Sequence, residues 1–203
     1  MKLYGAPMPA PNPRRVRIFL AEKGIDLPET PVSLTKREHK SPEHRARNSL
    51  GQVPTLELDD GTCISETVAI CRYLEEVQPE PPLFGRTAVE KALVEMWVRR
   101  VEFAAMMPVG NFWRHAHPFT AQLLTQFKEF GESNRETYAG AQRWLDRELA
   151  DRPYLAGDSY TVADICLLST VDFAAWTGLP LSDDAKNLRA WHERVSARPS
   201  AKA

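Results

Sequence analysis

The organisation of this chain is decided by the stretch Gly51–Ile70, which reads GQVPTLELDDGTCISETVAI. Apolar and polar side chains alternate over residues 53–58, and this pattern predicts a strand. Asp59-Asp60-Gly61 predicts a tight hairpin turn, because Asp and Gly accept the backbone angles that such turns need. Thr62-Cys63-Ile64 returns as the partner strand, and Ser65-Glu66-Thr67 opens a helix. The stretch therefore predicts a β-hairpin that leads directly into a helix.

The residues before this stretch predict a strand, a helix, a second strand and a second helix. Leu3-Tyr4 is the first strand candidate, and a loop with many prolines follows it. The first helix is expected to begin at Asn12-Pro13, since Asn is a good cap and Pro suits the first helical position, and to end at Gly24. The second strand is expected within residues 27–34, and a short helix is expected from Ser41. The predicted order is thus β-α-β-α-β-β-α.

The character of the sequence changes after residue 78. Residues 79–86 begin with three prolines among four residues and predict a linker. Residues 87–203 show helical spacing and no convincing strand, and Pro108 is expected to bend or break the first long helix. Further helices are expected from Leu123 to about Leu149, from Thr161 and near Asp183. The predicted fold class is α+β, with a small α/β domain over residues 1–78 followed by an all-helical domain.

The charge balance argues against two classes of partner. The chain has 26 Lys and Arg against 27 Asp and Glu, a net charge of −1, so no overall field attracts nucleic acid or an anionic membrane. No apolar run approaches the length of a membrane span, and no signal peptide is evident. The three cysteines form no Cys-x-x-Cys pair, which favours buried thiols and the cytoplasm. His115 and His117 belong to no convincing set of metal ligands, and no metal is expected.

Two segments beside the hairpin carry groups that suit a peptide-like ligand. A cis Pro54 would leave the amide and carbonyl of Val53 free to pair with an extended peptide, although spacing alone favours a proline that merely starts a strand. Glu66 at a helix start suits an ammonium group, and the amide and hydroxyl of Thr67 suit a carboxylate. An ordinary acidic helix cap is the alternative for this second segment.

The order and spacing of these elements resemble the cytosolic glutathione S-transferase family over essentially the whole chain. A capping motif at Thr161 and Asp164, to which no catalytic role is given, completes the pattern. The matching segments are Met1–Tyr4, Asn12–Arg17, Gly51–Pro54, Glu66–Ile70, Tyr154–Asp158 and Ala163–Asp164. No single motif is specific to the family. The resemblance is specific because all the motifs occur together, at the expected spacing, on the predicted order of strands and helices.

The resemblance implies a thioredoxin-like N-terminal domain and a helical-bundle C-terminal domain. It implies that Val53 offers its backbone to the cysteinyl part of glutathione, with Pro54 in the cis form. It also implies that Glu66 and Thr67 hold the γ-glutamyl end. Glutathione is then a co-substrate, and no other cofactor is expected.

For the glycyl carboxylate of glutathione the resemblance points to His39, nine residues before Asn48. Lys40 is the next candidate, and Gln52 is expected to help from the neighbouring loop. A solvated His39 without a role is the alternative, because basic residues are common in such an exposed segment.

The usual thiol-activating side chain of the family is missing. A Tyr, Ser or Cys near the end of the first strand normally donates a hydrogen bond to the sulfur and lowers its pKa. The usual serine position falls at about Ala10, and residues 6–11 carry no hydroxyl, thiol or amide side chain. Asn12 is our first choice for the donor. The alternatives are a backbone N–H at Met8, Ala10 or Asn12, and the hydroxyl of Tyr4.

The resemblance places the electrophile between the two domains. Six residues are expected to line that site, and they are Met8, Met107, Asn111, Phe112, His115 and Trp176. Such a lining accepts bulky apolar compounds, and ordinary core packing is the alternative for about half of these residues. The family resemblance also implies a homodimer.

The resemblance therefore implies a glutathione transferase that stabilises the glutathione thiolate and adds it to an apolar electrophile, as detoxification enzymes do. A glutathione-dependent disulfide or peroxide reductase is a second reading, favoured by the Asn in place of the hydroxyl. A binding or regulatory protein on the same scaffold, with weak or no turnover, is the third.

Overall fold

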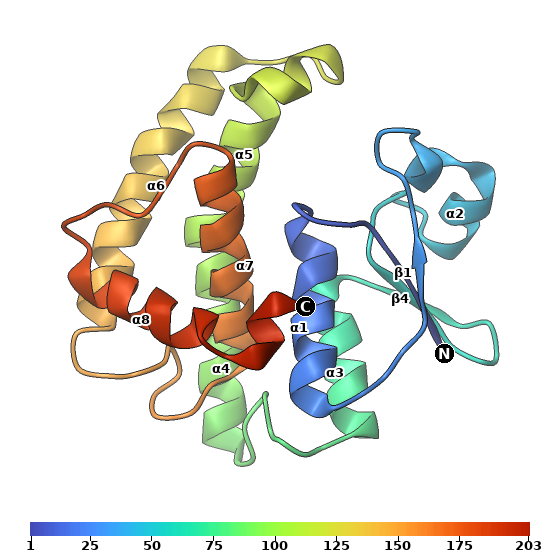
Figure 1. Ribbon diagram of the computed structural model, residues 1–203, viewed down its shortest axis with the longest axis horizontal. Coiled ribbons are helices and arrows are strands. Elements are labelled where there is room, and N and C mark those ends of the chain that lie inside the picture. Colours follow the sequence, from blue (N-terminus) through green and yellow to red (C-terminus); the bar gives the residue numbers. More distant parts are fainter. The chain divides into compact units, whose positions relative to one another are not determined.

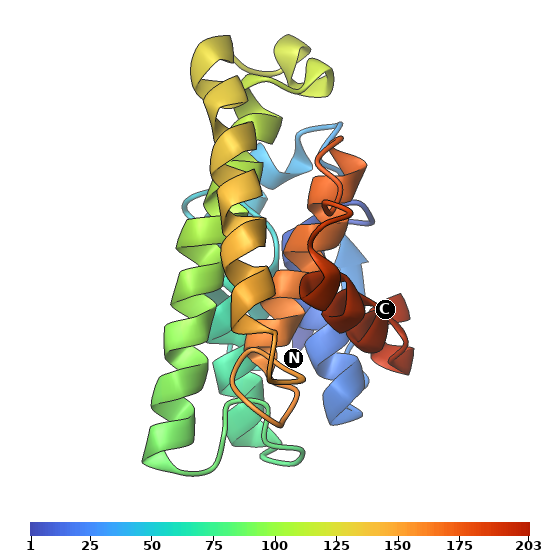
Figure 2. The same cartoon turned by 90° about the vertical axis from the view of Figure 1, so that its left-hand side faces the viewer.

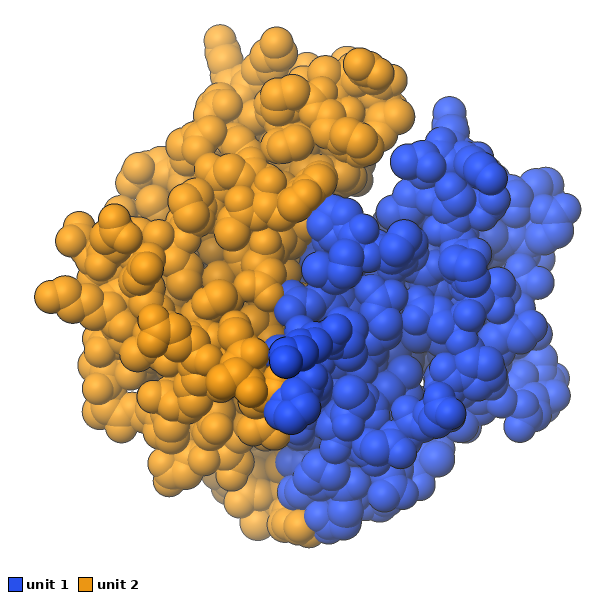
Figure 3. All heavy atoms as spheres, viewed as in Figure 1, with its two compact units in different colours: residues 1–83, 199–203 blue, residues 84–198 orange.

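The computed structural model describes residues 1–203 and consists of two compact units, which Figure 3 colours separately. The first unit contains Met1–Leu83 together with Pro199–Ala203, and the second contains Phe84–Arg198. The last five residues join the first unit because Arg14 donates a hydrogen bond to the Ala201 carbonyl at 2.9 Å. The division expected from sequence assigns them to the helical part.

The first unit is built on a four-stranded mixed sheet with the strand order β2-β1-β3-β4. Strand β2 runs parallel to β1, whereas β3 is antiparallel to both β1 and β4. The register aligns Leu3, Leu56 and Ile64 in one row across three strands. The strands are β1 (Lys2–Gly5), β2 (Glu29–Pro31), β3 (Thr55–Glu57) and β4 (Cys63–Ser65).

Helices cover both faces of this sheet. Helices α1 and α3 pack against each other on one face, and α2 lies on the other (Figure 1). The observed order confirms the predicted β-α-β-α-β-β-α arrangement. The elements are α1 (Pro11–Lys23), α2 (Pro42–Arg47) and α3 (Thr67–Val77), with the short 3-10 helices η1 (Glu38–Lys40) and η4 (Pro199–Lys202).

The start of α1 differs from the sequence-based expectation. The helix begins at Pro11, and Ala10 rather than Asn12 is the capping residue. Pro11 already has the fixed backbone angle that the first helical position needs, so the helix starts one residue earlier and Asn12 lies inside the first turn. The predicted end is confirmed, because Gly24 closes α1 in the left-handed conformation with φ 64°.

The second unit is all-helical, as predicted. Helix α4 continues through a π-helical turn, η2, into α5, and α6 runs back alongside α5 (Figure 2). Helix α7 is buried along most of its length. The elements are α4 (Ala88–Val101), η2 (Glu102–Met106), α5 (Met107–His115), η3 (Pro118–Gln122), α6 (Lys128–Glu148), α7 (Val162–Trp176) and α8 (Lys186–Ser196).

The segment from α4 to α6 corrects two further expectations. No break occurs at Pro108, because α4, the π-helical turn η2 and α5 follow one another without interruption and Pro108 lies in the first turn of α5. Leu123, Leu124 and Phe127 lie in the connection before α6 rather than in its first turns. Polar side chains in this connection bond to nearby backbone carbonyls, since Thr120 donates to the Trp113 carbonyl at 2.6 Å. Such bonds compete with continuous helix.

The capping motif at the start of α7 is confirmed and holds three segments together. Asp164 is fully buried and accepts hydrogen bonds from the amides of Leu155 and Thr161, both at 3.0 Å. It also accepts a bond from Trp191 Nε1 of α8 at 2.9 Å. No helix of this chain combines the length and the apolar character that crossing a membrane requires.

Candidate functional site

The strand register gathers several predicted site residues at one end of the sheet. Thr55 of β3 pairs with Tyr4 of β1 on one side and with Ser65 of β4 on the other. Both neighbours are antiparallel to β3, so the end of β1, the beginning of β3 and the end of β4 coincide. The loop that leads into α1, the Val53–Pro54 segment and the Glu66–Thr67 segment therefore all leave the sheet at this end.

The Val53–Pro54 peptide bond is cis, as predicted. Pro54 is buried, and Val53 is half-buried just before β3 begins. No hydrogen bond of the fold uses the amide or the carbonyl of Val53. Backbone groups of this kind, at the margin of a sheet, can pair with an extended peptide as an added strand does.

Glu66 has an unusual backbone conformation for a residue with a side chain. Its φ is 70°, and it stands at the capping position of α3 without a side-chain capping bond. A non-glycine residue in this region costs about 1–3 kcal/mol, which is characteristic of functional sites. The side chain is exposed, and Thr67 beside it is buried as the first residue of α3. The first amides of a helix have no partner within the helix and attract anions.

The segment around η1 contains two of the predicted basic residues. His39 has a ring nitrogen, Nδ1, that is buried without a hydrogen-bond partner. Burial lowers the pKa of His39, and the positive charges of Lys40 and Arg37 lower it further, while a hydrogen bond with the Ser33 backbone acts in the opposite direction. Lys40 donates from Nζ to the carbonyls of Leu50 at 3.0 Å and Gly51 at 2.7 Å. Lys40 therefore secures the loop before Gln52, whose own side chain is exposed.

Two residues that hold this loop were missed by sequence reasoning. His44 lies on α2 and Asn48 follows it, and both side chains bond to the carbonyl of Gln52, at 2.7 Å and 3.1 Å. Both residues are buried. The only sequence signal was their spacing of four residues, which sets two side chains on the same side of a helix. Nothing in that spacing indicates which carbonyl they reach.

Asn12 lies in the first turn of α1, where Pro11 and Pro13 supply no amide hydrogen. It is therefore the only one of the first three helical residues with a backbone N–H. Its side-chain oxygen, Oδ1, is buried without a hydrogen-bond partner. The fold therefore leaves the acceptor oxygen of this amide side chain unused.

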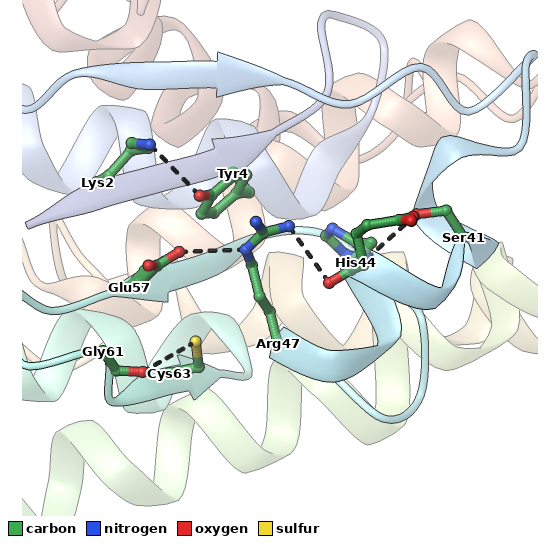
Figure 4. A network of polar contacts seen from close by, with 9 residues as sticks. Lys2, Tyr4, Ser41, His44, Arg47, Glu57, Gly61 and Cys63 are labelled. Carbon is green, nitrogen blue, oxygen red and sulfur yellow. Dashed lines mark hydrogen bonds and ion pairs between the residues drawn. The ribbon is translucent and has the colours of Figure 1, made fainter.

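Tyr4, the alternative thiol donor, is part of a polar network on the α2 side of the sheet (Figure 4). Its hydroxyl lies 3.5 Å from Lys2 Nζ, and its hydrogen bond to Glu57 is the main cause of the lowered pKa of that carboxyl group. The Arg47 guanidinium lies 4.4 Å from the centre of the Tyr4 ring. These contacts, together with the near-complete burial of Tyr4, favour a structural role.

The predicted electrophile residues fall into an exposed group and a packed group. Met8 is 55 % exposed, Met107 48 % and Trp176 47 %. Trp176 stacks on the rings of Phe173 and His117, each with a centroid distance of 5.7 Å. These three predicted residues have apolar surface available to a ligand.

The other three predicted electrophile residues make contacts with α6 or the segment before it. Asn111 donates to Asn134 at 3.2 Å. Phe112 is buried beneath the Arg135 guanidinium, 4.6 Å from its ring centre. The His115 ring lies against the rings of residues 127 and 130. A cavity of about 490 Å³ between α6 and residues 178–185 contains none of the predicted site residues.

Family comparisons cover both units. The family model described as "Glutathione S-transferase, N-terminal domain" matches residues 1–76. The model described as "Glutathione S-transferase, C-terminal domain" matches residues 115–199. The two matches follow the same order along the chain as the sheet-containing unit and the helical unit.

Individual relatives resemble the whole chain. Glutathione S-transferase 2 of Saccharomyces cerevisiae is 40 % identical over 206 aligned positions, covering 100 % of this chain and 88 % of the relative. The crystal structure of Gtt2 from Saccharomyces cerevisiae has a TM-score of 0.93 and 39 % identity, covering 100 % of this chain and 99 % of that one. A glutathione S-transferase domain-containing protein of Marinobacter aquaeolei has a TM-score of 0.92 and 38 % identity, covering 98 % and 99 %.

Proposed function

The chain belongs to the glutathione S-transferase family, and we propose that it binds reduced glutathione at the end of the sheet where Val53, Pro54, Glu66 and Thr67 lie. The unpaired backbone of Val53 is the observation that carries this proposal, because it offers a donor and an acceptor to the cysteinyl part of the tripeptide. Residues 1–78 are then the glutathione-binding domain, and residues 87–203 follow the linker 79–86.

The two ends of glutathione have separate partners in this proposal. The carboxylate of Glu66 receives the ammonium group of the γ-glutamyl end, and the first amides of α3 with the Thr67 hydroxyl receive its carboxylate. The glycyl carboxylate lies toward His39 and Lys40, with the Gln52 side chain beside them. The Nδ1 atom of His39 supports this assignment, because it has no hydrogen-bond partner in the fold.

Asn12 is the proposed activating residue. Its side-chain amide donates a hydrogen bond to the glutathione sulfur, which favours the thiolate and lowers the thiol pKa. The positive end of α1, where Asn12 lies, acts in the same direction. The thiol proton passes to solvent, and the thiolate forms a bond from sulfur to an electrophilic carbon. A leaving group then departs, or the adduct takes up a proton.

The second substrate is proposed to be a bulky apolar electrophile. The exposed surfaces of Met8, Met107 and Trp176 support this choice, because apolar and aromatic side chains form most ligand pockets. The same proposed lining includes Asn111, Phe112 and His115. Their contacts with α6 and the segment before it leave less of each side chain free to contact a ligand. A cytoplasmic homodimer is proposed from the family alone.

A pH titration of thiolate absorbance tests the proposal. Glutathione bound to the wild-type protein is expected to ionise below the usual thiol pKa of about 8.5. Asn12→Ala is expected to raise this pKa, and Asn12→Asp to raise it further, because the carboxylate repels the thiolate. A low pKa that both variants retain would assign the role to a backbone amide. Binding without any pKa shift in the wild type would instead support a non-catalytic binding protein.

A further inference from the structure

The carbonyl of Gln52 is held by two side chains from the α2 side of the sheet. His44 Nε2 lies 2.7 Å from this oxygen, and Asn48 Nδ2 lies 3.1 Å from it. A carbonyl oxygen only accepts hydrogen bonds, so both nitrogens are donors. The two donors come from different points of the chain and converge on one atom, which restrains the direction of this peptide group.

The direction of the Gln52 carbonyl also determines the direction of the next amide. The Gln52–Val53 peptide bond is trans, and in a trans peptide the C=O and N–H groups point to opposite sides. The carbonyl points toward His44 and Asn48, so the Val53 N–H points away from them. This is the same amide that takes part in no hydrogen bond of the fold.

Both donors are themselves held in place. His44 is 3 % exposed, its backbone amide donates to the Ser41 hydroxyl at 3.2 Å, and its ring meets the edge of the Tyr4 ring. Asn48 accepts the Leu50 amide at 3.1 Å through its side-chain oxygen. Buried donors that are fixed by packing hold a third group more firmly than exposed ones do.

We infer that His44 and Asn48 are positioning residues that aim the Val53 amide at the cysteinyl carbonyl of glutathione. The inference rests on the proposed function, since it assigns how one contact of the glutathione site is preorganised. Neither side chain touches glutathione or the sulfur in this arrangement. The pair therefore affects glutathione affinity and leaves the activation of the thiol to Asn12.

Two substitutions of His44 separate the hydrogen bond from the packing. His44→Phe keeps a ring against Tyr4 and loses the donor, whereas His44→Gln keeps a donor. His44→Phe is expected to weaken glutathione binding about five- to tenfold, the usual effect of one hydrogen bond. His44→Gln is expected to stay within about threefold of the wild type. Arg47→Met is the control, because it removes another contact of α2 and leaves Gln52 untouched.

The readouts are calorimetry for glutathione affinity, steady-state kinetics with a nitroaryl chloride, and the pKa of the bound thiol. The expected result is a raised KM for glutathione in His44→Phe, with kcat at saturation and the thiol pKa unchanged. If His44→Gln and Arg47→Met weaken glutathione binding as much as His44→Phe does, the inference is overturned, because that result would indicate a general loosening of α2. Wild-type affinity in His44→Phe would also overturn it and leave the proposed function standing.

A wild-type protein that binds no glutathione would overturn the proposed function and this inference together. Circular dichroism of each variant establishes that it is folded. Asn48→Asp replaces His44→Phe if that variant does not fold, because it exchanges the donor for an acceptor and keeps the oxygen that accepts from Leu50. It is expected to raise the KM for glutathione without changing the thiol pKa, and an unchanged KM would overturn the inference.

Discussion

Thr55 lies directly opposite Ser65 in the antiparallel pair of β3 and β4. This pairing brings the segment before Thr55 and the segment after Ser65 to the same end of the sheet. The unpaired backbone of Val53 and the strained backbone of Glu66 are therefore neighbours in the fold, although 12 residues separate them along the chain. A ligand with a peptide backbone and an α-amino-acid end can use both segments at once.

Glu66 is expected to strengthen glutathione binding and, through its strained backbone, to lower the free energy of unfolding. Glu66→Gln should weaken glutathione binding by about 1.5–3 kcal/mol, the range of a charge-assisted hydrogen bond. Glu66→Gly should weaken binding as well, and it should raise the free energy of unfolding by up to about 1 kcal/mol, because glycine accepts a φ of 70°. Calorimetry and denaturant unfolding of both variants test the pair. A glycine variant that is less stable than the wild type would contradict the strain argument.

The affinity for glutathione is expected to depend on pH through His39. Burial and the neighbouring cations lower the pKa of His39, so its ring is neutral at pH 7 and must take up a proton to pair with the glycyl carboxylate. Glutathione should therefore bind more tightly as the pH falls toward the lowered pKa of His39. The measurement is calorimetry between pH 5 and 7, compared with His39→Gln, in which this part of the dependence should disappear.

The stability of the free protein should change with pH in the opposite sense. A histidine whose pKa is lower in the folded state takes up protons more readily when the chain is unfolded. The contribution of His39 is thus fully present above its unfolded pKa and is lost as pH falls through its folded pKa. Unfolding by urea at pH 7 and pH 5 measures the loss, and a loss of equal size in His39→Gln would assign it to other groups.

Trp176 and Phe112 are expected to behave differently although both were predicted to line the electrophile site. Trp176 is about half exposed, so Trp176→Ala should raise the KM for an apolar electrophile and leave glutathione affinity unchanged. Phe112 is 4 % exposed beneath Arg135, so Phe112→Ala should lower the free energy of unfolding by about 3–5 kcal/mol. Kinetics and thermal unfolding of the two variants, side by side, test this division.

Asp164 is expected to be the most sensitive polar position of the helical unit. Asp164→Ala leaves buried donors of Leu155, Thr161 and Trp191 without their acceptor, at about 1–3 kcal/mol for each. Asp164→Asn keeps one acceptor oxygen, so it should lower the free energy of unfolding clearly less than Asp164→Ala does. Guanidinium unfolding measures the loss of stability in both variants. Equal losses would show that the charge of Asp164, rather than its acceptor oxygens, stabilises the start of α7.

The sequence by itself determined the order of the strands and helices in the first unit and the residues at which several elements begin or end. Asp-Asp-Gly at 59–61 forms the predicted hairpin turn, Gly24 closes the first helix, and Thr161 with Asp164 caps α7. Each of these features depends on backbone angles and hydrogen bonds among residues a few positions apart. Local chemistry of this kind is readable from a single sequence.

The tertiary structure decided which groups meet. Nothing local indicated that His44 and Asn48 reach the Gln52 carbonyl, because the path of the intervening loop sets that contact. The place of Asn12 in the first turn of α1 depended on whether Pro11 or Pro13 starts the helix, and both are locally acceptable. The direction of the Val53 N–H is likewise set by the packed fold, since the hydrogen bonds from His44 and Asn48 orient the Gln52–Val53 peptide group.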